Sequence, residues 1–291
     1  MKRFGKAKMF GLFTLFFFIG WFSYFENNHL TVTKITIPLP DTVLGFEGLR
    51  IVQLSDLHGK LFGRNQELLL AKIAGLHPDM IVFTGDLVDA GHYRETPGLM
   101  LLGTLARRCP VFMVGGNHES GSGRFHDLAK RLKFHGVRVL RDERLILARG
   151  DERLALIGMD DLPDIHGRWY SSDSWIRLRL GKLISGLEAG EGKTRTYKIL
   201  LVHRPEKFAI YGESGVNLVL TGHAHGGQIR LPWLGGLYAP GQGYFPKLTS
   251  GLYGLPNSQT KMIVNRGLGN SGFPQRLGNC PEIGLIILKC F

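Results

Sequence analysis

Five short apolar runs constrain this chain more than any other feature of its sequence. They occupy residues 49–54, 80–84, 111–114, 199–202 and 218–220. Each is rich in β-forming residues, and Asp, His or Asn follows each run within a few positions. In open α/β sheets, ligands bind just beyond the carboxyl ends of the strands. Five strands that bring such side chains to one edge would build a compact polar cluster there.

Helical patterns separate the earlier runs and indicate the fold class. They cover residues 65–76, 96–108 and 124–135, and in the first of them Leu68 is expected on the buried face. Strand–helix–strand alternation predicts parallel βαβ units in the first half of the chain. In the second half, shorter β-rich runs predict a second sheet packed on the first; they lie at 154–157, 262–264 and 283–288. We therefore expect one α/β domain over residues 30–291.

The polar residues behind the five runs share the chemistry of metal ligands. They are Asp56 and His58, Asp86, Asn117 with His118, His203, and finally His223 with His225. In D-x-H and H-x-H the two side chains are two residues apart, so an extended backbone would point both to the same side. Carboxylate, imidazole and amide ligands without thiolate suit Mn²⁺, Fe or Zn²⁺ rather than Ca²⁺.

Each of these motifs alone has an ordinary structural explanation. A lone D-x-H after a strand is more often a cap or a turn, and His203 alone could be a hydrogen-bonded histidine at a sheet edge. The ordered set of five, each member at a strand end, is poorly explained in that way. The combination predicts a metal centre.

The first 29 residues form a separate segment. Lys2, Arg3, Lys6 and Lys8 precede an uncharged, Phe-rich run over residues 9–25. This is the pattern of a signal peptide or a signal anchor. Aromatic residues occupy the region where a small-x-small cleavage site would stand. We therefore interpret residues 1–29 as a basic segment followed by an uncleaved hydrophobic membrane anchor.

The membrane face of the domain is left open by this segment. The basic residues would keep the N-terminus in the cytoplasm and send the domain to the other side. A short, aromatic-rich helix could instead lie in the membrane interface and leave the domain cytoplasmic.

The charge balance and the cysteines limit the partners. Lys and Arg number 36 against 24 Asp and Glu, a formal net charge of +12, which favours phosphorylated substrates or acidic lipid. No nucleic-acid motif is present, so we expect no nucleic-acid partner, and nothing predicts an obligate protein partner. Cys109, Cys280 and Cys290 form no zinc motif, and Cys280–Cys290 is the only pair close enough in sequence to suggest a bridge.

Five motifs, taken together, resemble the signature of the calcineurin-like metallophosphoesterases. They are D-x-H at 56–58, G-D at 85–86, G-N-H-E at 116–119, His203, and G-H-x-H-G at 222–226. The resemblance covers residues 49–228. It implies a four-layer αββα sandwich of two mixed sheets, here preceded by the hydrophobic anchor helix. It also implies two metal ions that share Asp86: one held by Asp56, His58 and His225, the other by Asn117, His203 and His223.

The chemistry that the resemblance implies is two-metal hydrolysis of a phosphoester. The two ions, with Mn²⁺ favoured over Fe or Zn²⁺, would neutralise phosphoryl oxygens and activate a water molecule. His118 matches the histidine that contacts phosphate and protonates the leaving group, a role that suits imidazole near neutral pH.

A narrower resemblance lies further along the chain, at residues 223–232, 238–240, 251–253 and 264–269. These segments look like the small bacterial membrane-associated branch of the family. That branch includes general phosphodiesterases and the UDP-2,3-diacylglucosamine pyrophosphatases of lipid A synthesis, which implies a location at the bacterial inner membrane. Asn265 and Arg266 are candidate contacts to phosphate or head group, although Arg266 could instead bind loop carbonyls.

We therefore predict a metal-dependent hydrolase of phosphodiester or pyrophosphate bonds in an anionic, lipid-linked substrate at a membrane. UDP-2,3-diacylglucosamine, cleaved to UMP and the lipid phosphate, is the most specific candidate. Three alternatives stay open. One is a broader envelope phosphodiesterase that acts on cell-wall or phospholipid material, and another is a non-catalytic scaffold that keeps the fold. The third is a cytosolic phosphoprotein phosphatase, which the hydrophobic anchor disfavours.

Overall fold

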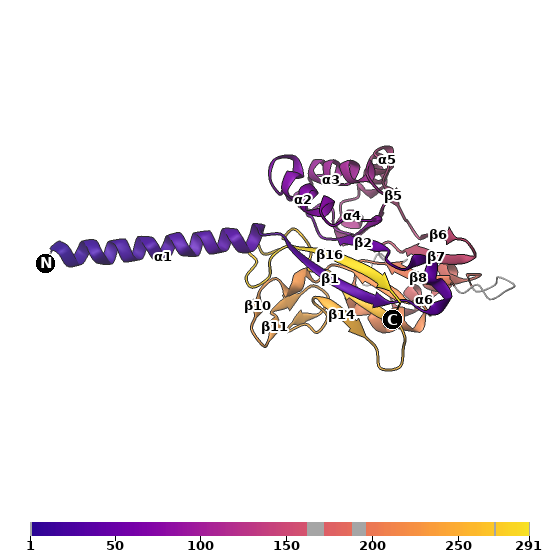
Figure 1. Cartoon of the computed structure of the whole chain (residues 1–291). Coiled ribbons are helices and arrows are strands. Elements are labelled where there is room, and N and C mark those ends of the chain that lie inside the picture. Colours follow the sequence, from indigo (N-terminus) through magenta and orange to yellow (C-terminus); the bar gives the residue numbers. More distant parts are fainter. Residues whose placement is uncertain (1, 162–171, 188–195, 271, 291) are drawn as a thin grey trace.

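The computed structural model describes residues 2–161, 172–187, 196–270 and 272–290. The chain begins with helix α1 (Lys2–Asn28), which projects away from the remaining elements (Figure 1). Its 20-residue stretch Met9–Asn28 is long and apolar enough to cross a membrane. A signal sequence also meets these two criteria of length and composition. At 1.5 Å per residue this stretch measures about 30 Å, the thickness of a bilayer's hydrocarbon core.

The first sheet has six strands in the order β1-β16-β2-β3-β4-β5. Their bounds are Thr31–Pro38 for β1, Glu282–Lys289 for β16, Arg50–Leu54 for β2, Met80–Thr84 for β3, Val111–Val114 for β4 and Arg138–Val139 for β5. Strands β2 to β5 are parallel, and β16 pairs antiparallel with β2, with Ile286 opposite Ile51. The sheet is therefore mixed.

The second sheet also has six strands, in the order β14-β15-β9-β8-β7-β6. Their bounds are Gly251–Gly254 for β14, Lys261–Val264 for β15, Leu218–Thr221 for β9, Thr196–Leu201 for β8, Glu152–Gly158 for β7 and Glu143–Arg149 for β6. The four central strands are parallel, and both edge strands are antiparallel to their neighbours. Two short hairpins follow β9: β10 (Arg230–Leu231) with β11 (Gly235–Gly236), and β12 (Tyr238–Ala239) with β13 (Gly243–Tyr244).

Three apolar clusters build four layers. The middle cluster joins the inner faces of the two sheets, as Val82 and Ile286 pack in it with Leu156 and Leu220. On the outer face of the first sheet lie α2 (Glu67–Ala74), α3 (Thr96–Ala106) and α5 (Phe125–Phe134). On the outer face of the second sheet lie α6 (Asp173–Ile184) and α7 (Phe208–Glu213). The predicted α/β fold of two mixed sheets behind an apolar N-terminal helix is confirmed.

Some sequence predictions are corrected. The second half of the chain does not build the second sheet alone, because its last strand, β16, inserts between β1 and β2 of the first sheet. Leu68 does not lie on the buried face of its helix: it is 58% exposed, whereas Leu69 and Ile73 form the buried face of α2. Cys280 and Cys290 are both free thiols, so the suggested bridge is not formed.

The last turns of α1 are attached to the domain by hydrogen bonds. The backbone carbonyl of Ser23 accepts from the Gln275 side-chain amide at 3.1 Å. The Asn27 side-chain oxygen accepts from the Arg276 N–H at 2.9 Å, and the buried Glu26 carboxylate accepts from the Asn279 N–H at 2.9 Å. The segment that we assigned to the anchor thus contributes directly to the packing around residues 275–279.

Candidate metal centre

The candidate ligands lie at the carboxyl ends of strands from both sheets. Asp56 and His58 follow β2, and Asp86 follows β3 of the first sheet. His203 follows β8, and His223 and His225 follow β9 of the second sheet. The central strands end in the same direction because they are parallel, so the two sheets bring these side chains together at one edge.

The backbone at this edge is strained. Asp56, His58, Asp86, His223 and His225 all have positive φ, between 47° and 65°. Residues with side chains rarely adopt this left-handed region, and such outliers cluster at functional sites. We had expected the D-x-H and H-x-H pairs to be extended, and these φ values show that they are not. Tight turns, rather than strand pleating, aim both members of each pair into the cluster.

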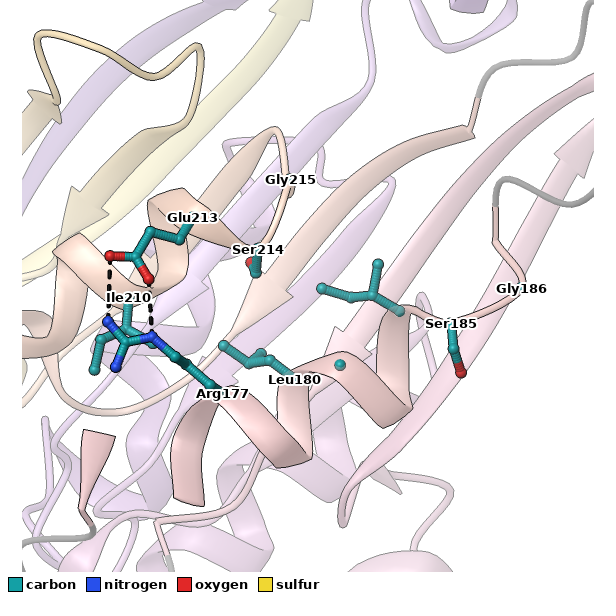
Figure 2. A pocket seen from close by; sticks show the side chains of 10 residues that line it. Arg177, Leu180, Ser185, Gly186, Ile210, Glu213, Ser214 and Gly215 are labelled. Atoms are coloured by element: carbon teal, nitrogen blue, oxygen red, sulfur yellow. Dashed lines mark hydrogen bonds and ion pairs between the residues drawn. The ribbon is translucent and has the colours of Figure 1, made fainter. Parts of the chain in front are cut away.

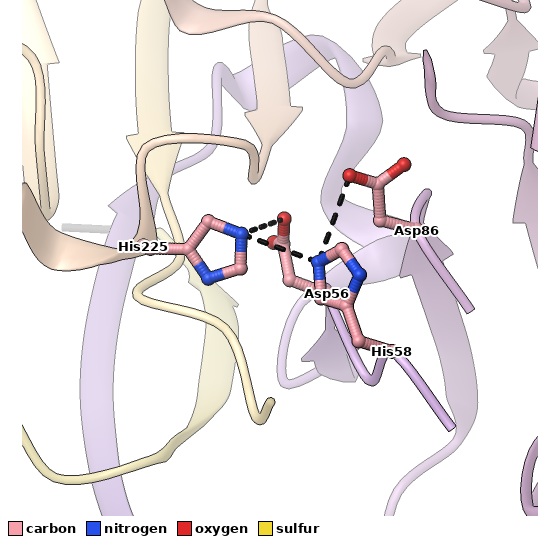
Figure 3. A group of neighbouring side chains, drawn as sticks. All are labelled: Asp56, His58, Asp86 and His225. Atoms are coloured by element: carbon pink, nitrogen blue, oxygen red, sulfur yellow. Dashed lines mark hydrogen bonds and ion pairs between the residues drawn. The ribbon is translucent and has the colours of Figure 1, made fainter. Parts of the chain in front are cut away.

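The first group of ligands contains Asp56, His58, Asp86 and His225 (Figure 3). The Nε2 atoms of His58 and His225 are 3.2 Å apart. His225 Nε2 lies 3.4 Å from an Asp56 carboxylate oxygen, and His58 Nε2 lies 3.7 Å from Asp86 Oδ2. One ligand atom from each of the four residues lies within 4.8 Å of the others, which is the spacing of a set of ligands around one ion.

The second group contains Asp86, His203 and His223. His203 Nε2 lies 3.0 Å from Asp86 Oδ2 and 3.1 Å from His223 Nδ1. The same Asp86 oxygen therefore faces His58 in the first group and His203 in the second. This is the arrangement expected of a carboxylate that bridges two metal ions.

Burial and charge oppose each other in this cluster. Burial alone would raise the pKa of Asp86, but the adjacent His203 and the other imidazoles hold that pKa well below its usual range. Burial also lowers the pKa of His58 to about 4 and raises that of Asp56 to about 6. Neutral imidazoles are the form that binds metal ions.

Several polar atoms at this edge lack the partners that buried groups require. Within the described part of the chain, Asn117 Oδ1 and His58 Nδ1 are buried without a hydrogen-bond partner. Unpaired buried polar atoms are costly. Divalent cations would satisfy Asn117 Oδ1 and would lie between the Nε2 atoms of His58 and His225, which are 3.2 Å apart. The residues present thus fit two ions, with Asn117 as a further candidate ligand of the second.

Close packing holds the ligand loops in place. The buried Glu119 carboxylate accepts hydrogen bonds from the N–H groups of Asp86 at 2.7 Å and of Gly116 at 2.8 Å, so it joins the loops after β3 and β4. At Gly222 an added Cβ would lie 1.9 Å from Ser55 Oγ and 2.3 Å from Asp56 Oδ2. Only glycine allows the loops after β2 and β9 to approach so closely.

A segment near the C-terminus supports the cluster from behind, and sequence reasoning missed it. The fully buried Arg276 guanidinium donates to the Gly269 carbonyl and lies 3.4 Å from His225 Nδ1. The Asn279 side chain donates to the backbone carbonyl of His225 at 2.7 Å. These two residues belong to no recognisable motif, because the histidine that they contact is more than fifty residues away in sequence.

The two candidate substrate contacts lie beside this segment. Asn265 is buried, and its side-chain oxygen accepts from the Gly267 N–H at 2.8 Å. The Arg266 guanidinium lies against Glu282 on β16 and Thr31 on β1. Neither residue lines the hollow next to the ligands that is described below, so a role in substrate binding stays a prediction.

A hollow of about 360 Å³ opens beside the second ligand group, lined by Asn117, His118, His223, Arg204 and Pro240 among others. Arg204 donates to Asp161 Oδ2 at 2.8 Å, and its Nη1 lies 3.2 Å from His223 Nε2. No motif had placed this cation in the site. It provides positive charge at the wall of the hollow, where an anionic group would enter.

His118 lines the same hollow, and its surroundings select one tautomer. The N–H of Ala90 donates to His118 Nδ1 at 3.0 Å, so neutral His118 carries its proton on Nε2. Asp89 Oδ2 lies 3.7 Å from Nδ1 of both His118 and His58. A carboxylate at that distance stabilises a positive charge on either ring.

A larger hollow of about 580 Å³ lies between α6 and α7, away from this chemistry. The Arg177 guanidinium and the Glu213 carboxylate form an ion pair beside it, with a distance of 2.9 Å (Figure 2). Its described lining includes none of the candidate ligands.

The fold has two mixed sheets, and their strand ends present two sets of ligands that share one carboxylate. This combination defines a metal-dependent phosphoesterase. The family model of the calcineurin-like phosphoesterases matches residues 49–227. The chain belongs to this family, as its motifs predicted.

Relatives support the same assignment. The uncharacterized metallophosphoesterase YkuE of Bacillus subtilis is 32% identical, over 93% of this chain and 89% of that protein. The UDP-2,3-diacylglucosamine pyrophosphatase LpxG of Chlamydia trachomatis is 26% identical, over 93% of this chain and 92% of that protein. The crystal structure of TT1561 from Thermus thermophilus shares the fold, with a TM-score of 0.51 at 15% identity over 76% of this chain and 90% of that one.

The shared position of Asp86 leads to a first prediction. In Asp86→Ala, both ligand groups lose a member, so metal content and phosphoesterase turnover should fall to background together. Metal analysis of the purified protein and hydrolysis of an aryl phosphodiester would measure the two effects. Asp127→Ala, which removes a well-exposed carboxylate on α5, should change neither. Normal turnover in Asp86→Ala would refute the assignment of the centre.

The close approach at Gly222 leads to a second prediction. Gly222→Ala should displace the Asp56 carboxylate and weaken metal affinity by roughly 10–100-fold, as changes around metal ligands typically do. Titration of the metal-free protein with Mn²⁺ would measure this loss. Gly181→Ala on α6 is the matched control, because nothing lies within 4 Å of the added methyl group. Equal affinities in both variants would show that the loop tolerates the methyl group.

Proposed function

We propose that this protein hydrolyses phosphodiester or pyrophosphate bonds in an anionic, lipid-linked substrate at a bacterial inner membrane. UDP-2,3-diacylglucosamine, cleaved to UMP and the lipid phosphate, is the specific substrate that we favour. The observation that carries the proposal is the direct attachment of α1 to the domain at residues 275–279, which also contact His225. If α1 lies in a membrane, the metal centre is held near lipid.

The similarity to LpxG supports the choice of substrate. It extends over 93% of this chain, so it includes more than the common catalytic motifs. The basic surplus of the chain suits an anionic substrate at an acidic membrane surface. Arg204 at the wall of the hollow would bind a phosphate oxygen or another anionic group of this substrate.

The ligand chemistry supports two divalent ions, of which we favour Mn²⁺ because the donors are carboxylate, imidazole and amide groups without sulfur. When bound, the two ions would neutralise phosphoryl oxygens and lower the pKa of a water molecule between them. The protein's own part is to orient the substrate and to move a proton. Asp86 is fixed by a hydrogen bond from its own N–H to Glu119 and by the backbone N–H of His118, which donates to Asp86 Oδ1 at 2.9 Å. It thereby holds the two groups of ligands together.

His118 is the residue that we propose as the proton donor. In the neutral ring the Ala90 N–H keeps the proton on Nε2, and the ring borders the hollow beside the second ligand group. The proton donor is the imidazolium, whose second proton on Nδ1 would face Asp89 Oδ2, 3.7 Å away, instead of the Ala90 N–H. When the bond between phosphorus and the leaving oxygen breaks, the Nε2 proton passes to that oxygen and a neutral ring remains.

This role leads to a third prediction. His118→Ala should lower kcat by about 10²–10⁴-fold, the usual contribution of a general acid, while the bound metal remains almost unchanged. Steady-state kinetics and metal analysis on the same preparation would separate the two effects. His126→Ala, at an exposed position on α5, is the control. Equal losses of metal and activity in His118→Ala would instead make His118 a structural part of the centre.

The substrate is tested by a fourth prediction. Purified full-length protein with Mn²⁺ in detergent micelles should release UMP from UDP-2,3-diacylglucosamine, and Asp86→Ala should not. Chromatographic separation of UMP from the substrate would measure the release.

The opposite outcome has a definite meaning. Absence of UMP release, with an aryl phosphodiester still cleaved, would favour the alternative of an envelope phosphodiesterase that acts on cell-wall or phospholipid material. Absence of all turnover with metal still bound would favour a non-catalytic scaffold. Either result would leave the fold and family as they are.

A further inference from the structure

The surface of the domain around the end of α1 is unusually apolar. Five large side chains on three loops are solvent-exposed there: Leu61, Leu231, Trp233, Leu234 and Phe273. Trp233 is fully exposed and Leu234 is 64% exposed, although both stand in the short connection between β10 and β11. We call these five residues the apolar rim. Exposed apolar groups gathered in one place usually mark a binding surface.

The contacts of α1 place these loops next to one another. Gln275 binds Ser23, and the Pro274 carbonyl accepts from the Asn27 side chain at 3.1 Å, so Phe273 stands directly beside the helix. The Gln228 side chain donates to the Phe273 carbonyl at 2.8 Å, and the Arg230 N–H donates to the Leu277 carbonyl at 2.8 Å. The β10–β11 hairpin is therefore joined to the segment 273–277 that contacts the helix, and Figure 1 shows the hairpin near the junction of α1 with the domain.

The loop with Leu61 completes the rim. The Lys60 ammonium group, next to Leu61, donates to the backbone carbonyl of Asn27 at the end of α1. Lys60 thus satisfies a terminal carbonyl of the helix, where positive charge is favourable. The apolar rim therefore reaches the helix end from the loop after β2 as well as from the C-terminal segment.

The depth of α1 decides what covers this surface. Ser23 belongs to the stretch Met9–Asn28 that is long enough to span a bilayer. Five residues of α-helix separate Ser23 from Asn28, a rise of about 7.5 Å. If the end of that stretch lies at the boundary of the hydrocarbon core, Gln275, which is hydrogen-bonded to Ser23, lies within about 7.5 Å of this boundary. The neighbouring apolar side chains then lie at the same level.

We propose that the apolar rim inserts into the membrane interface, so that the domain docks on the same lipid bilayer that contains α1. The occupant is the lipid surface itself. Tryptophan is characteristic of this layer, where an apolar ring meets lipid head groups, and Leu and Phe are buried at its acyl boundary. Exposed Arg64 near Leu61 and the net charge of +12 favour anionic lipids. The docking rests on the proposed membrane location of α1.

The fifth prediction tests the depth of Trp233. Full-length protein is reconstituted into vesicles of phosphatidylethanolamine and phosphatidylglycerol with brominated acyl chains, which quench tryptophan fluorescence at short range. The emission of a single tryptophan is obtained by subtracting the emission spectrum of Trp233→Phe, Trp21→Phe or Trp175→Phe from that of the wild type. We expect strong quenching of Trp21 in the span, clear quenching of Trp233, and none of Trp175 on α6.

The three signals separate the possible failures. Quenching of Trp21 without quenching of Trp233 would overturn the docking and leave the membrane location of α1 intact. Quenching of neither would overturn both. If Trp233 is shielded from aqueous acrylamide but not quenched by brominated lipid, a protein surface, such as a second copy of this chain, covers it and the lipid proposal fails. Trp233→Phe is expected to fold normally, because the Trp233 side chain is fully exposed among the described residues.

A second measurement links the docking to catalysis. The double variant Trp233→Asp, Leu234→Asp should turn over a soluble aryl phosphodiester at the wild-type rate, because neither residue lines the hollow beside the ligands. Its turnover of a lipid-linked phosphoester in vesicles should fall. Equal loss on both substrates would show that the hairpin supports the centre rather than the membrane contact.

Discussion

The structure depends on one buried carboxylate. Asp86 faces imidazole nitrogens from both sheets, at 3.7 Å from His58 and 3.0 Å from His203, and a group so placed must be balanced by positive charge. The surrounding features hold the loops that carry it in place: the amide groups that Glu119 binds, the left-handed turns after the strands, and the glycine at 222 that admits Asp56. Strain of this kind persists only where the rest of the fold holds it in place. The middle apolar cluster between the two sheets supplies that support.

The sequence predicted the chemistry better than the geometry. Strands β3 and β4 were predicted with correct ends, because fully buried parallel strands read as continuous apolar runs. Strands β1 and β6 were missed, since each is an edge strand with many polar and exposed residues and without a long apolar run. The place of β16 in the first sheet is a tertiary choice that no local pattern encodes.

The site shows the same division. The ligand types at strand ends were recognisable because their order along the chain is distinctive, whereas positive φ at Asp56 or His223 leaves no mark in composition. Arg204 was not among the predicted site residues, although it borders the hollow beside the ligands. Arg276 and Asn279 were not noticed at all, because Arg276 contacts the His225 ring and Asn279 its backbone carbonyl across more than fifty residues of sequence. Long-range support of this kind becomes visible only in three dimensions.

The attachment of α1 has a consequence for how this protein would search for its substrate. Glu26 and Asn27 bind the same short segment that supports His225, so no flexible linker separates the helix from the centre. With α1 in a bilayer, the centre would travel in a plane at a fixed height above the lipid, and its encounters would be two-dimensional. Substrates would then be selected by how far their phosphate stands from the acyl chains, before any contact with the hollow is made.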